Sequence, residues 1–396
     1  MTKRLMFGLL AAVLAAALLA VPGVSRAQDD EAAGIYDWEE FGITLTLPEG
    51  WEALPGGQDY DLALASPEAV EGGNGSFVLF THVPSLGPGV DIDAALAPIA
   101  GQVGGEVTPL TVGDLEGAEI AFTDEQSGSA HHLALIPYGT SGQYFYVQSA
   151  ALSEEDDSVV VDVLSSMTID PVQPDYAALD TALQTSLSEQ ESFLLGASDA
   201  PVTMVEYLDF ACGHCANYSQ DVDRLIALHV EPGDVHLELR LLDTVGGDLS
   251  NQAAQATYCA AEQGKGYSAY KALFQGYLDQ GAQEAYSRDG ISDLLSDPDL
   301  ALDVDALNAC VDEGTYAGVI DQSREDASAS GVTGTPSVLL SAGGDDPIFL
   351  TLPDGQTWAG GVPLAILRPI IDRVIADEVT PQEALDAELS QESTAE

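Results

Sequence analysis

The stretch that decides the fold is VTMVEYLDFACGHC, residues 202–215, which ends in two cysteines, Cys212 and Cys215, with Gly-His between them. Its first part is apolar and β-prone, which predicts a strand that runs into Cys212. Beyond the motif, apolar residues recur at helical spacing and predict a helix: Tyr218, Val222, Leu225 and Ile226. Free N–H groups and the positive dipole end at the start of a helix favour a thiolate on Cys212. Two thiols at this spacing can also close a reversible disulfide.

The first 27 residues have the pattern of a cleaved secretory signal. Lys3 and Arg4 precede an apolar run from Leu5 to Val21, and small residues follow at Ser25-Arg26-Ala27. An uncleaved membrane anchor is the alternative, although the run is short for a span of about 20 residues. We expect signal cleavage at residue 27 and a mature chain without a membrane span, exported to the periplasm or the extracellular space.

The chain is strongly acidic. Its 396 residues include 11 Lys and Arg against 65 Asp and Glu, which gives a formal net charge of −54 at pH 7. Such a surface repels nucleic acid and anionic lipid, so we expect neither as a partner. We interpret the charge as an adaptation to solubility or high salt, and attraction of basic substrates is the alternative.

Length and composition indicate two domains. Residues 35–170 combine strand-like stretches with helical patterns, which is typical of an α+β domain. We expect its strands at 43–47, 76–83, 117–122, 131–138 and 143–150, and its helices near 91–100 and 154–167. Residues 171–190 read as a linker, 191–378 as the second domain, and 379–396 as an acidic, flexible tail.

The first domain opens with YDWEEFGITLTLPEGW at 36–51 and closes with a helix followed by SMTI at 166–169. Both segments resemble PsbP-like domains, and this resemblance implies a binding or assembly module rather than an enzyme. His131 and His132 are adjacent, but neighbouring strand residues face opposite ways, so we do not expect them to share a metal.

The second domain continues with an alternating stretch at 236–241, helical patterns from 250 to 326, and GVTGTP at 331–336. We expect strands at 337–341 and near 348–352, then a helix at 363–376. With the CGHC motif, this order is similar to the DsbA-like thiol–disulfide oxidoreductases of the thioredoxin superfamily. The long separation of CGHC from Thr335-Pro336 leaves room for a helical insert that plain thioredoxins lack. The resemblance therefore implies an α/β thioredoxin-like domain with an inserted helical subdomain, preceded by the smaller α+β domain.

The same resemblance implies a role for each matching residue. Cys212 matches the exposed nucleophile of mixed-disulfide exchange, and Cys215 matches the buried resolving thiol. His214 lies between them and is expected to stabilise the Cys212 thiolate. Glu206 matches the buried acid that helps to manage the proton of the resolving cysteine.

Thr335 and Pro336 match the cis-proline loop that faces the active site and pairs with an extended substrate chain.

Each role has an alternative. The CGHC cysteines could be half of a structural zinc site. His214 could be an inert helix residue, Glu206 a partly exposed carboxylate, and Pro336 a trans turn proline.

Cys259 and Cys310 fall within the expected helical insert. Four cysteines permit three pairings, and a pair of Cys212 with Cys215 leaves these two together. We expect a structural disulfide between them, with two separate buried thiols as the alternative.

These features predict an exported thiol–disulfide oxidoreductase that needs no cofactor and acts on reduced or misoxidised secreted proteins. An unidentified membrane redox partner would reoxidise its Cys212–Cys215 pair. Gly-His between the cysteines resembles protein disulfide isomerase, so a reductase or isomerase is an open alternative. Two other classes stay open: a Cu(I) chaperone with Cys212, His214 and Cys215 as soft ligands, and a binding protein with vestigial thiols.

Overall fold

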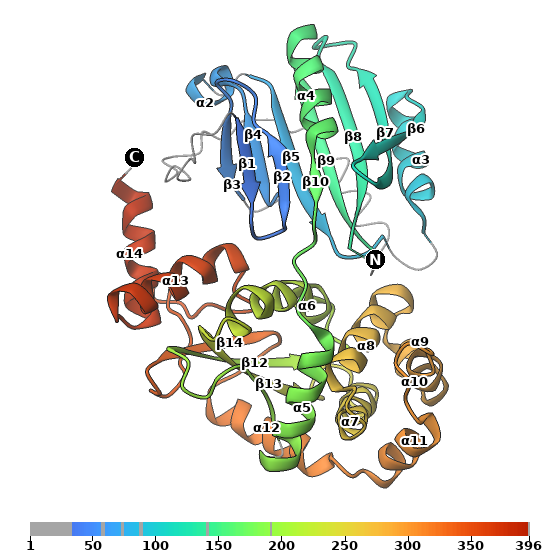
Figure 1. Cartoon of the computed structure of the whole chain (residues 1–396), viewed down its shortest axis with the longest axis vertical. Coiled ribbons are helices and arrows are strands. Elements are labelled where there is room, and N and C mark those ends of the chain that lie inside the picture. The colour runs from blue at the N-terminus through green and yellow to red at the C-terminus, as the bar shows by residue number, and fades with distance from the viewer. Residues whose placement is uncertain are drawn as a thin grey trace. The chain divides into compact units, whose positions relative to one another are not determined.

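The structure is a computed structural model that describes residues 34–56, 60–72, 75–86, 90–139, 142–190 and 192–394. These residues form two compact units, one up to Pro171 and one from Val172 to Ser390 (Figure 1). The expected signal peptide at 1–27 lies outside the described residues. Within them, we find no helix with the length and apolar character that a membrane span requires.

The N-terminal unit is an α+β domain, as the sequence predicts. In its described part, the main sheet is antiparallel and has the order β3-β4-β5-β9-β8-β7-β6. Its strands are β3 (Glu52–Pro55), β4 (Leu62–Ala65), β5 (Phe77–Val83), β6 (Val107–Val112), β7 (Leu115–Thr123), β8 (Ala130–Tyr138) and β9 (Gln143–Ala151). A smaller sheet contains β1 (Ile35–Trp38), β2 (Ile43–Thr46) and β10 (Thr168–Ile169). The helices are α2 (Pro67–Gly72), α3 (Ile92–Val103) and α4 (Glu154–Ser166).

Helices α3 and α4 cover opposite faces of the main sheet. Successive residues of a strand point to opposite faces. On β8, Ala134 and Ile136 pack in one hydrophobic cluster with α4 and the smaller sheet. Leu133 and Leu135 pack in a second cluster with α3. The sheet is therefore buried on both sides, which accounts for the nearly continuous apolar run of β8.

The C-terminal unit is built on a mixed sheet with the order β11-β13-β12-β14. Strands β12 and β13 are parallel, and the other two run antiparallel to their neighbours. Their bounds are β11 (Phe193–Leu195), β12 (Val202–Asp209), β13 (Val235–Leu242) and β14 (Ser337–Ala342). On β12, Met204 and Leu208 face the main core, whereas Val205 and Tyr207 face a second cluster, so this strand is buried on both faces.

Helices connect and cover these strands (Figure 1). Helix α6 (Gly213–Leu225) and a π-helical turn at Ile226–Val230 lead from β12 to β13, and α13 (Leu364–Asp377) packs against α6 and β12. The expected helical insert lies between β13 and β14. It consists of α7 (Asp248–Glu262), α8 (Gly266–Gln280), α9 (Ala282–Ala285), α10 (Arg288–Leu295), α11 (Val304–Glu313) and α12 (Ala317–Ala329).

The core of the C-terminal unit extends beyond the expected limits of 191 and 378. Residues 171–190, expected as a linker, contain α5 (Tyr176–Gln190), which buries a face of leucines spaced four residues apart: Leu179, Leu183 and Leu187. The tail at 379–396, expected to be flexible, contains α14 (Pro381–Thr394), and this helix buries Ala384 and Leu385 in the same core. Neither segment is strongly apolar on average, but each has an apolar face that the core covers.

The strand expected near 348–352 is reduced to two isolated bridges. Leu340 pairs with Ile348, and Thr351 pairs with Thr357. A turn reverses the chain directly after Leu352, where the Gly355 N–H donates to the Leu352 carbonyl. The segment is therefore too short to continue the sheet.

Candidate active site

Strand β12 delivers the CGHC motif to the start of a helix. The strand ends at Asp209, Cys212 is the N-cap residue of α6, and Gly213 is its first helical residue. Cys215 lies in the first turn and is 1% exposed, whereas Cys212 is 8% exposed. Both are free thiols in this structure. The predicted junction of strand, motif and helix is confirmed.

The loop that precedes β14 lies against Cys212. Strand β14 pairs with β12 so that Ser337 is opposite Tyr207, and the peptide bond between Thr335 and Pro336 is cis. The Cys212 thiol donates a hydrogen bond to the Thr335 carbonyl at 3.2 Å. The buried Thr335 hydroxyl has no hydrogen-bond partner among the described residues. The two segments that the sequence predicted to meet are in contact.

The surroundings of Cys212 stabilise its thiolate. The largest effect is a hydrogen bond from the Cys215 thiol to the Cys212 sulfur, and burial opposes it. The backbone N–H groups of Cys215 and His214 add further hydrogen bonds, and the neighbouring Thr335 side chain also lowers the pKa. Together they lower the pKa of Cys212 from 9.0 to about 5. This thiol is ionised at pH 7, and the thiolate is the form that attacks a disulfide.

Cys215 has the opposite character. Burial raises the pKa of its thiol above the ordinary value, and the neighbouring Cys212 sulfur raises it further. The Asp209 backbone N–H donates to the Cys215 sulfur at 3.5 Å. Cys215 therefore keeps its proton while Cys212 is a thiolate. The expectation of an exposed Cys212 is wrong, because both thiols are buried and Cys212 is only the less buried of the two. A thiolate on Cys212 beside a protonated, more deeply buried Cys215 is the arrangement that dithiol exchange requires.

Glu206 is a buried acid on β12. Its side chain is 0% exposed, and neither carboxyl oxygen has a hydrogen-bond partner among the described residues. Burial and, next, the charge of Asp221 raise the pKa of Glu206 to about 8, against the opposing effect of Lys271. The alternative of a partly exposed carboxylate is wrong. A carboxyl group with this pKa can take up or release a proton near neutral pH.

His214 lies beside Cys212 and contributes through its backbone. Its side chain is exposed on the first turn of α6. The contact that lowers the pKa of Cys212 comes from the His214 backbone N–H rather than from the imidazole. The start of the helix therefore contributes to the stabilisation of the Cys212 thiolate.

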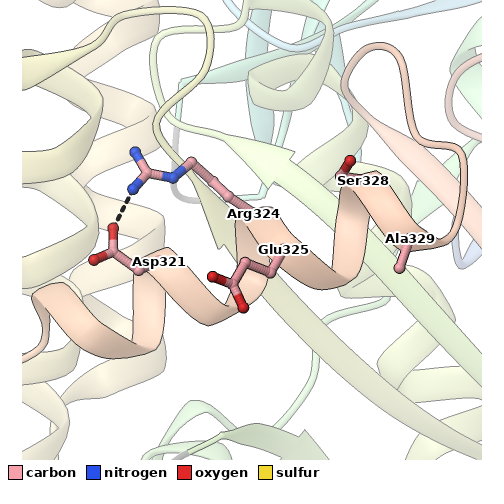
Figure 2. Close-up of a pocket in the computed structure, with 5 residues that line it drawn as sticks. All are labelled: Asp321, Arg324, Glu325, Ser328 and Ala329. Carbon is pink, nitrogen blue, oxygen red and sulfur yellow. Dashed lines mark hydrogen bonds and ion pairs between the residues drawn. The ribbon is translucent and has the colours of Figure 1, made fainter.

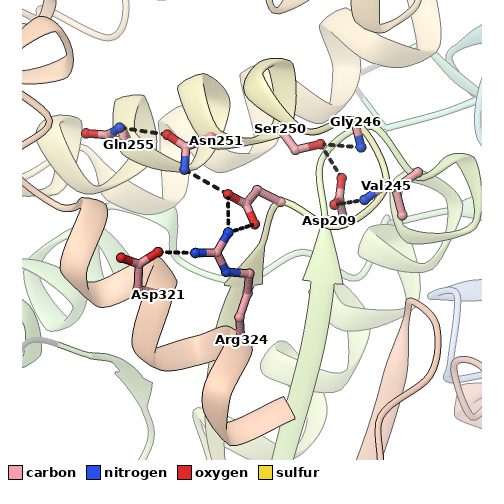
Figure 3. Close-up of polar contacts among 9 residues, drawn as sticks. Asp209, Val245, Gly246, Ser250, Asn251, Gln255, Asp321 and Arg324 are labelled. Carbon is pink, nitrogen blue, oxygen red and sulfur yellow. Dashed lines mark hydrogen bonds and ion pairs between the residues drawn. The ribbon is translucent and has the colours of Figure 1, made fainter. Parts of the chain in front are cut away.

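Asp209 is a residue of the site that the sequence reading missed (Figure 3). Its buried carboxylate accepts hydrogen bonds from the Ala211 N–H at 2.9 Å, the Val245 N–H at 2.7 Å and the Ser250 hydroxyl. Asp209 thus joins the loop before Cys212 to the start of α7. The available signal was a charged residue at the end of an otherwise apolar strand, three positions before the first cysteine.

Residues 188–342 match the protein-family model described as Thioredoxin. This part of the C-terminal domain is thioredoxin-like. The matched segment includes the CGHC motif, the helical insert and β14, so it spans every residue of the site described above.

Solved structures similar to the chain overlap about half of it or less. A thioredoxin-like oxidoreductase from Silicibacter pomeroyi has 23% identity and a TM-score of 0.37, and the match covers 50% of this chain and 96% of that one. BdbD from Bacillus subtilis has 22% identity and a TM-score of 0.34, and the match covers 39% of this chain and 82% of that one. α-DsbA1 from Wolbachia pipientis has 19% identity and a TM-score of 0.38, and the match covers 50% of this chain and 96% of that one.

A curated relative is the Na(+)/H(+) antiporter NhaA 3 of Salinispora tropica. The two sequences are 29% identical over 160 residues, which is 40% of this chain and 23% of the relative. The chain thus spans less than a quarter of the length of that protein.

The thioredoxin-like domain also contains the expected disulfide. Cys259 on α7 is bonded to Cys310 on α11, with Cα atoms 6.0 Å apart. Cys259 is buried, and Cys310 packs at the edge of the core. The bond links two helices of the insert that are separated by 51 positions in the sequence.

A surface hollow on α12 of the thioredoxin-like domain is separate from the predicted site residues (Figure 2). It is lined by Asp321, Arg324, Glu325, Ser328 and Ala329. Arg324 pairs with Asp321 and with Asp243, so its charge is already compensated. Among the described residues, no group of three or more His, Cys, Asp and Glu side chains is arranged to hold a metal ion.

Proposed function

We propose that this protein is an exported thiol–disulfide oxidoreductase that introduces or exchanges disulfides in secreted proteins. The observation that carries the proposal is the contrast between two thiols in one helical turn. Cys212 has a pKa of about 5, and the pKa of Cys215 is raised by burial. The thioredoxin-family match and the contact of Cys212 with the Thr335 carbonyl support it.

In the oxidising direction, a substrate thiolate attacks the Cys212 sulfur of the Cys212–Cys215 disulfide. A mixed disulfide with Cys212 forms, and Cys215 leaves and takes up a proton. A second substrate thiolate then attacks the substrate sulfur of the mixed disulfide and releases the Cys212 thiolate. The substrate has lost two electrons and the protein has gained them. The low pKa of Cys212 favours this direction because it makes Cys212 a good leaving group.

Glu206 is suited to supply the proton that Cys215 takes up. It is buried on the strand that leads to the motif, and its pKa of about 8 allows it to be protonated at neutral pH. A membrane redox partner would return the reduced pair to the disulfide form. In the reverse direction the same residues would reduce or isomerise substrate disulfides, with Cys212 as the attacking thiolate.

The decisive measurement is the equilibrium of the Cys212–Cys215 pair with glutathione buffers. It is made on the Cys259→Ser/Cys310→Ser variant, so that alkylation and mass report on a single pair. A potential between about −120 and −180 mV supports a disulfide donor or isomerase, and one near about −270 mV indicates a reductase. Cys212→Ser should abolish exchange, whereas Cys215→Ser should accumulate mixed disulfides. Absence of a reversible couple would refute the redox proposal, and Cu(I) binding would then be measured.

Export rests on the sequence of residues 1–27 and is part of the proposal. We expect the mature protein to begin directly after Ala27, which sequencing of its N-terminus tests. The N-terminal α+β domain is proposed as the binding or assembly module of the protein. Deletion of that domain should leave glutathione exchange intact and change only the recognition of protein partners.

A further inference from the structure

Tyr277 of α8 lies beside the first residue of α6. Its hydroxyl oxygen is 3.3 Å from the point that a Cβ atom on Gly213 would occupy, and two of its ring carbons are 3.8 and 4.0 Å from that point. The helical insert therefore places a side chain directly at the CGHC motif, next to the residue that follows Cys212.

A second tyrosine ties Tyr277 to the active-site strand. The rings of Tyr277 and Tyr286 are stacked, with centroids 6.2 Å apart and planes 20° apart. The buried Tyr286 hydroxyl lies 3.0 Å from the Phe210 carbonyl and 3.1 Å from the Leu273 carbonyl. Phe210 precedes Cys212 by two positions and packs on Tyr286 itself. Tyr277 is thus held at a defined place relative to the motif.

The hydroxyl of Tyr277 is available to a ligand. It makes no hydrogen bond among the described residues, and its side chain is only half-buried. Burial raises the pKa of Tyr277, and the negative charges of Cys212 and Asp209 raise it further. The hydroxyl is therefore a protonated donor at neutral pH. The donor lies beside the residue that follows Cys212.

We propose that Tyr277 contacts the substrate: its hydroxyl donates a hydrogen bond to a backbone carbonyl of the polypeptide joined to Cys212 in the mixed disulfide. This inference rests on the proposed thiol–disulfide exchange. Gly213 is part of the arrangement because any larger residue there would take up the space beside the hydroxyl. A backbone carbonyl is present in every polypeptide, so the contact favours protein substrates over small thiols without selecting a sequence.

The test is Tyr277→Phe, which keeps the ring and its stacking on Tyr286 and removes only the hydroxyl. The rate constant for oxidation of a reduced peptide with two cysteines should fall about two- to tenfold, the effect of one net hydrogen bond. The rate with dithiothreitol, which has no carbonyl group, and the equilibrium with glutathione should stay unchanged. Tyr316→Phe is the matched control, because the Tyr316 hydroxyl donates to Glu262 elsewhere in the insert. It should change none of these values.

A second variant tests the steric part of the arrangement. Gly213→Ala should slow the peptide reaction, because its Cβ would lie 3.3 Å from the Tyr277 hydroxyl. The Tyr277→Phe background lacks the hydroxyl oxygen, so Gly213→Ala should reduce the rate of the peptide reaction by a smaller factor there. The two effects should therefore be non-additive.

An unchanged peptide rate in Tyr277→Phe would overturn the inference. So would an equal loss with peptide and dithiothreitol, since the hydroxyl would then act on Cys212 and not on the polypeptide. Failure of the proposed function gives a different result, because the unmodified protein would then exchange with neither reagent, and both proposals would fall together.

Discussion

Cys212 and Cys215 lie in one helical turn, yet their thiols differ in proton affinity. Cys212 is at the N-cap, where the N–H groups of His214 and Cys215, the Cys215 thiol and the Thr335 side chain all act on its sulfur. Cys215 is one turn into the helix, where burial disfavours the charged form. The low pKa of the first thiol therefore depends on the protonated state of the second, and a thiolate on Cys212 stabilises the reduced form of the protein.

We expect the reduced protein to resist urea unfolding better than the disulfide form at pH 7. The pKa of Cys212 is lowered from 9.0 to about 5, so the stabilisation is fully present at pH 9 and is lost as the pH falls through 5. Within this range Cys215 stays protonated when folded. Unfolding curves of both forms at pH 5, 7 and 9 measure the effect, with Cys212→Ser as the control that lacks it. A disulfide form that is the more stable one at pH 7 would contradict the expectation.

Glu206→Gln should stabilise the protein at alkaline pH. The pKa of Glu206 is raised from 4.5 to about 8, so the cost of its burial is absent below pH 4.5 and grows until pH 8. At about 1.36 kcal/mol per pKa unit, the cost is at most about 5 kcal/mol. We expect the gain of the variant in free energy of unfolding to be larger at pH 8 than at pH 5. The exposed Glu325→Gln is the matched control, and an equal gain for Glu206→Gln at both pH values would argue against a protonated Glu206.

At the scale of elements, the junction of β12 and α6 is held by the helical insert rather than by the sheet alone. Asp209 at the end of β12 accepts hydrogen bonds from the Val245 N–H and from Ser250 on α7. Phe210 packs among aromatic side chains of the insert: Tyr270, Phe274 and Tyr286. The insert therefore positions Cys212, and changes in the packing of the insert should alter the position of this residue.

Removal of the Cys259–Cys310 disulfide should destabilise the insert without changing dithiol exchange at Cys212–Cys215. The bond closes a separation of 51 residues, for which loop-closure entropy corresponds to about 4 kcal/mol. Cys259→Ser/Cys310→Ser should unfold at a clearly lower urea concentration than the unmodified protein. Its equilibrium with glutathione at Cys212–Cys215 should be retained under native conditions. A potential that shifts together with stability would mean that the two cysteine pairs are coupled.

At the scale of the whole molecule, the negative charge is unevenly compensated. No Lys or Arg occurs between Arg26 and Arg224, so the described N-terminal unit contains neither. There, His132 lies between Glu119 and Asp157, and the hydrogen bond to Glu119 raises the pKa of His132 most. In the C-terminal unit, basic side chains form ion pairs with neighbouring acids: Arg224, Arg240, Lys265, Lys271, Arg288, Arg324 and Arg373.

Salt should therefore stabilise the protein, and the N-terminal unit most. The screening length falls from about 30 Å at 0.01 M to about 3 Å at 1 M salt, so repulsion among surface carboxylates is reduced. Calorimetry in 10 mM and 1 M NaCl should show a higher Tm at high salt. KCl should act in the same way, since the effect depends on ionic strength. An unchanged or lower Tm would show that self-repulsion does not limit stability.

The sequence by itself determined the elements whose evidence is local. A run of β-prone residues, two cysteines and a helical period predict the junction at Cys212, and cysteine arithmetic predicts the Cys259–Cys310 pair. Only the tertiary structure decided that the segments at 171–190 and 379–396 belong to the core. Neither segment is strongly apolar on average, so composition alone does not show that the core covers one face of each.

The tertiary structure also decided the chemistry around the motif. The pKa of Glu206 depends on burial and on charges from other elements, and the role of Asp209 depends on Val245 and Ser250, which lie more than thirty positions away. Tyr277 reaches Gly213 from a helix that the sequence places far from the motif. Patterns along a chain report which face of an element is apolar, whereas contacts between distant side chains are set only when the elements pack.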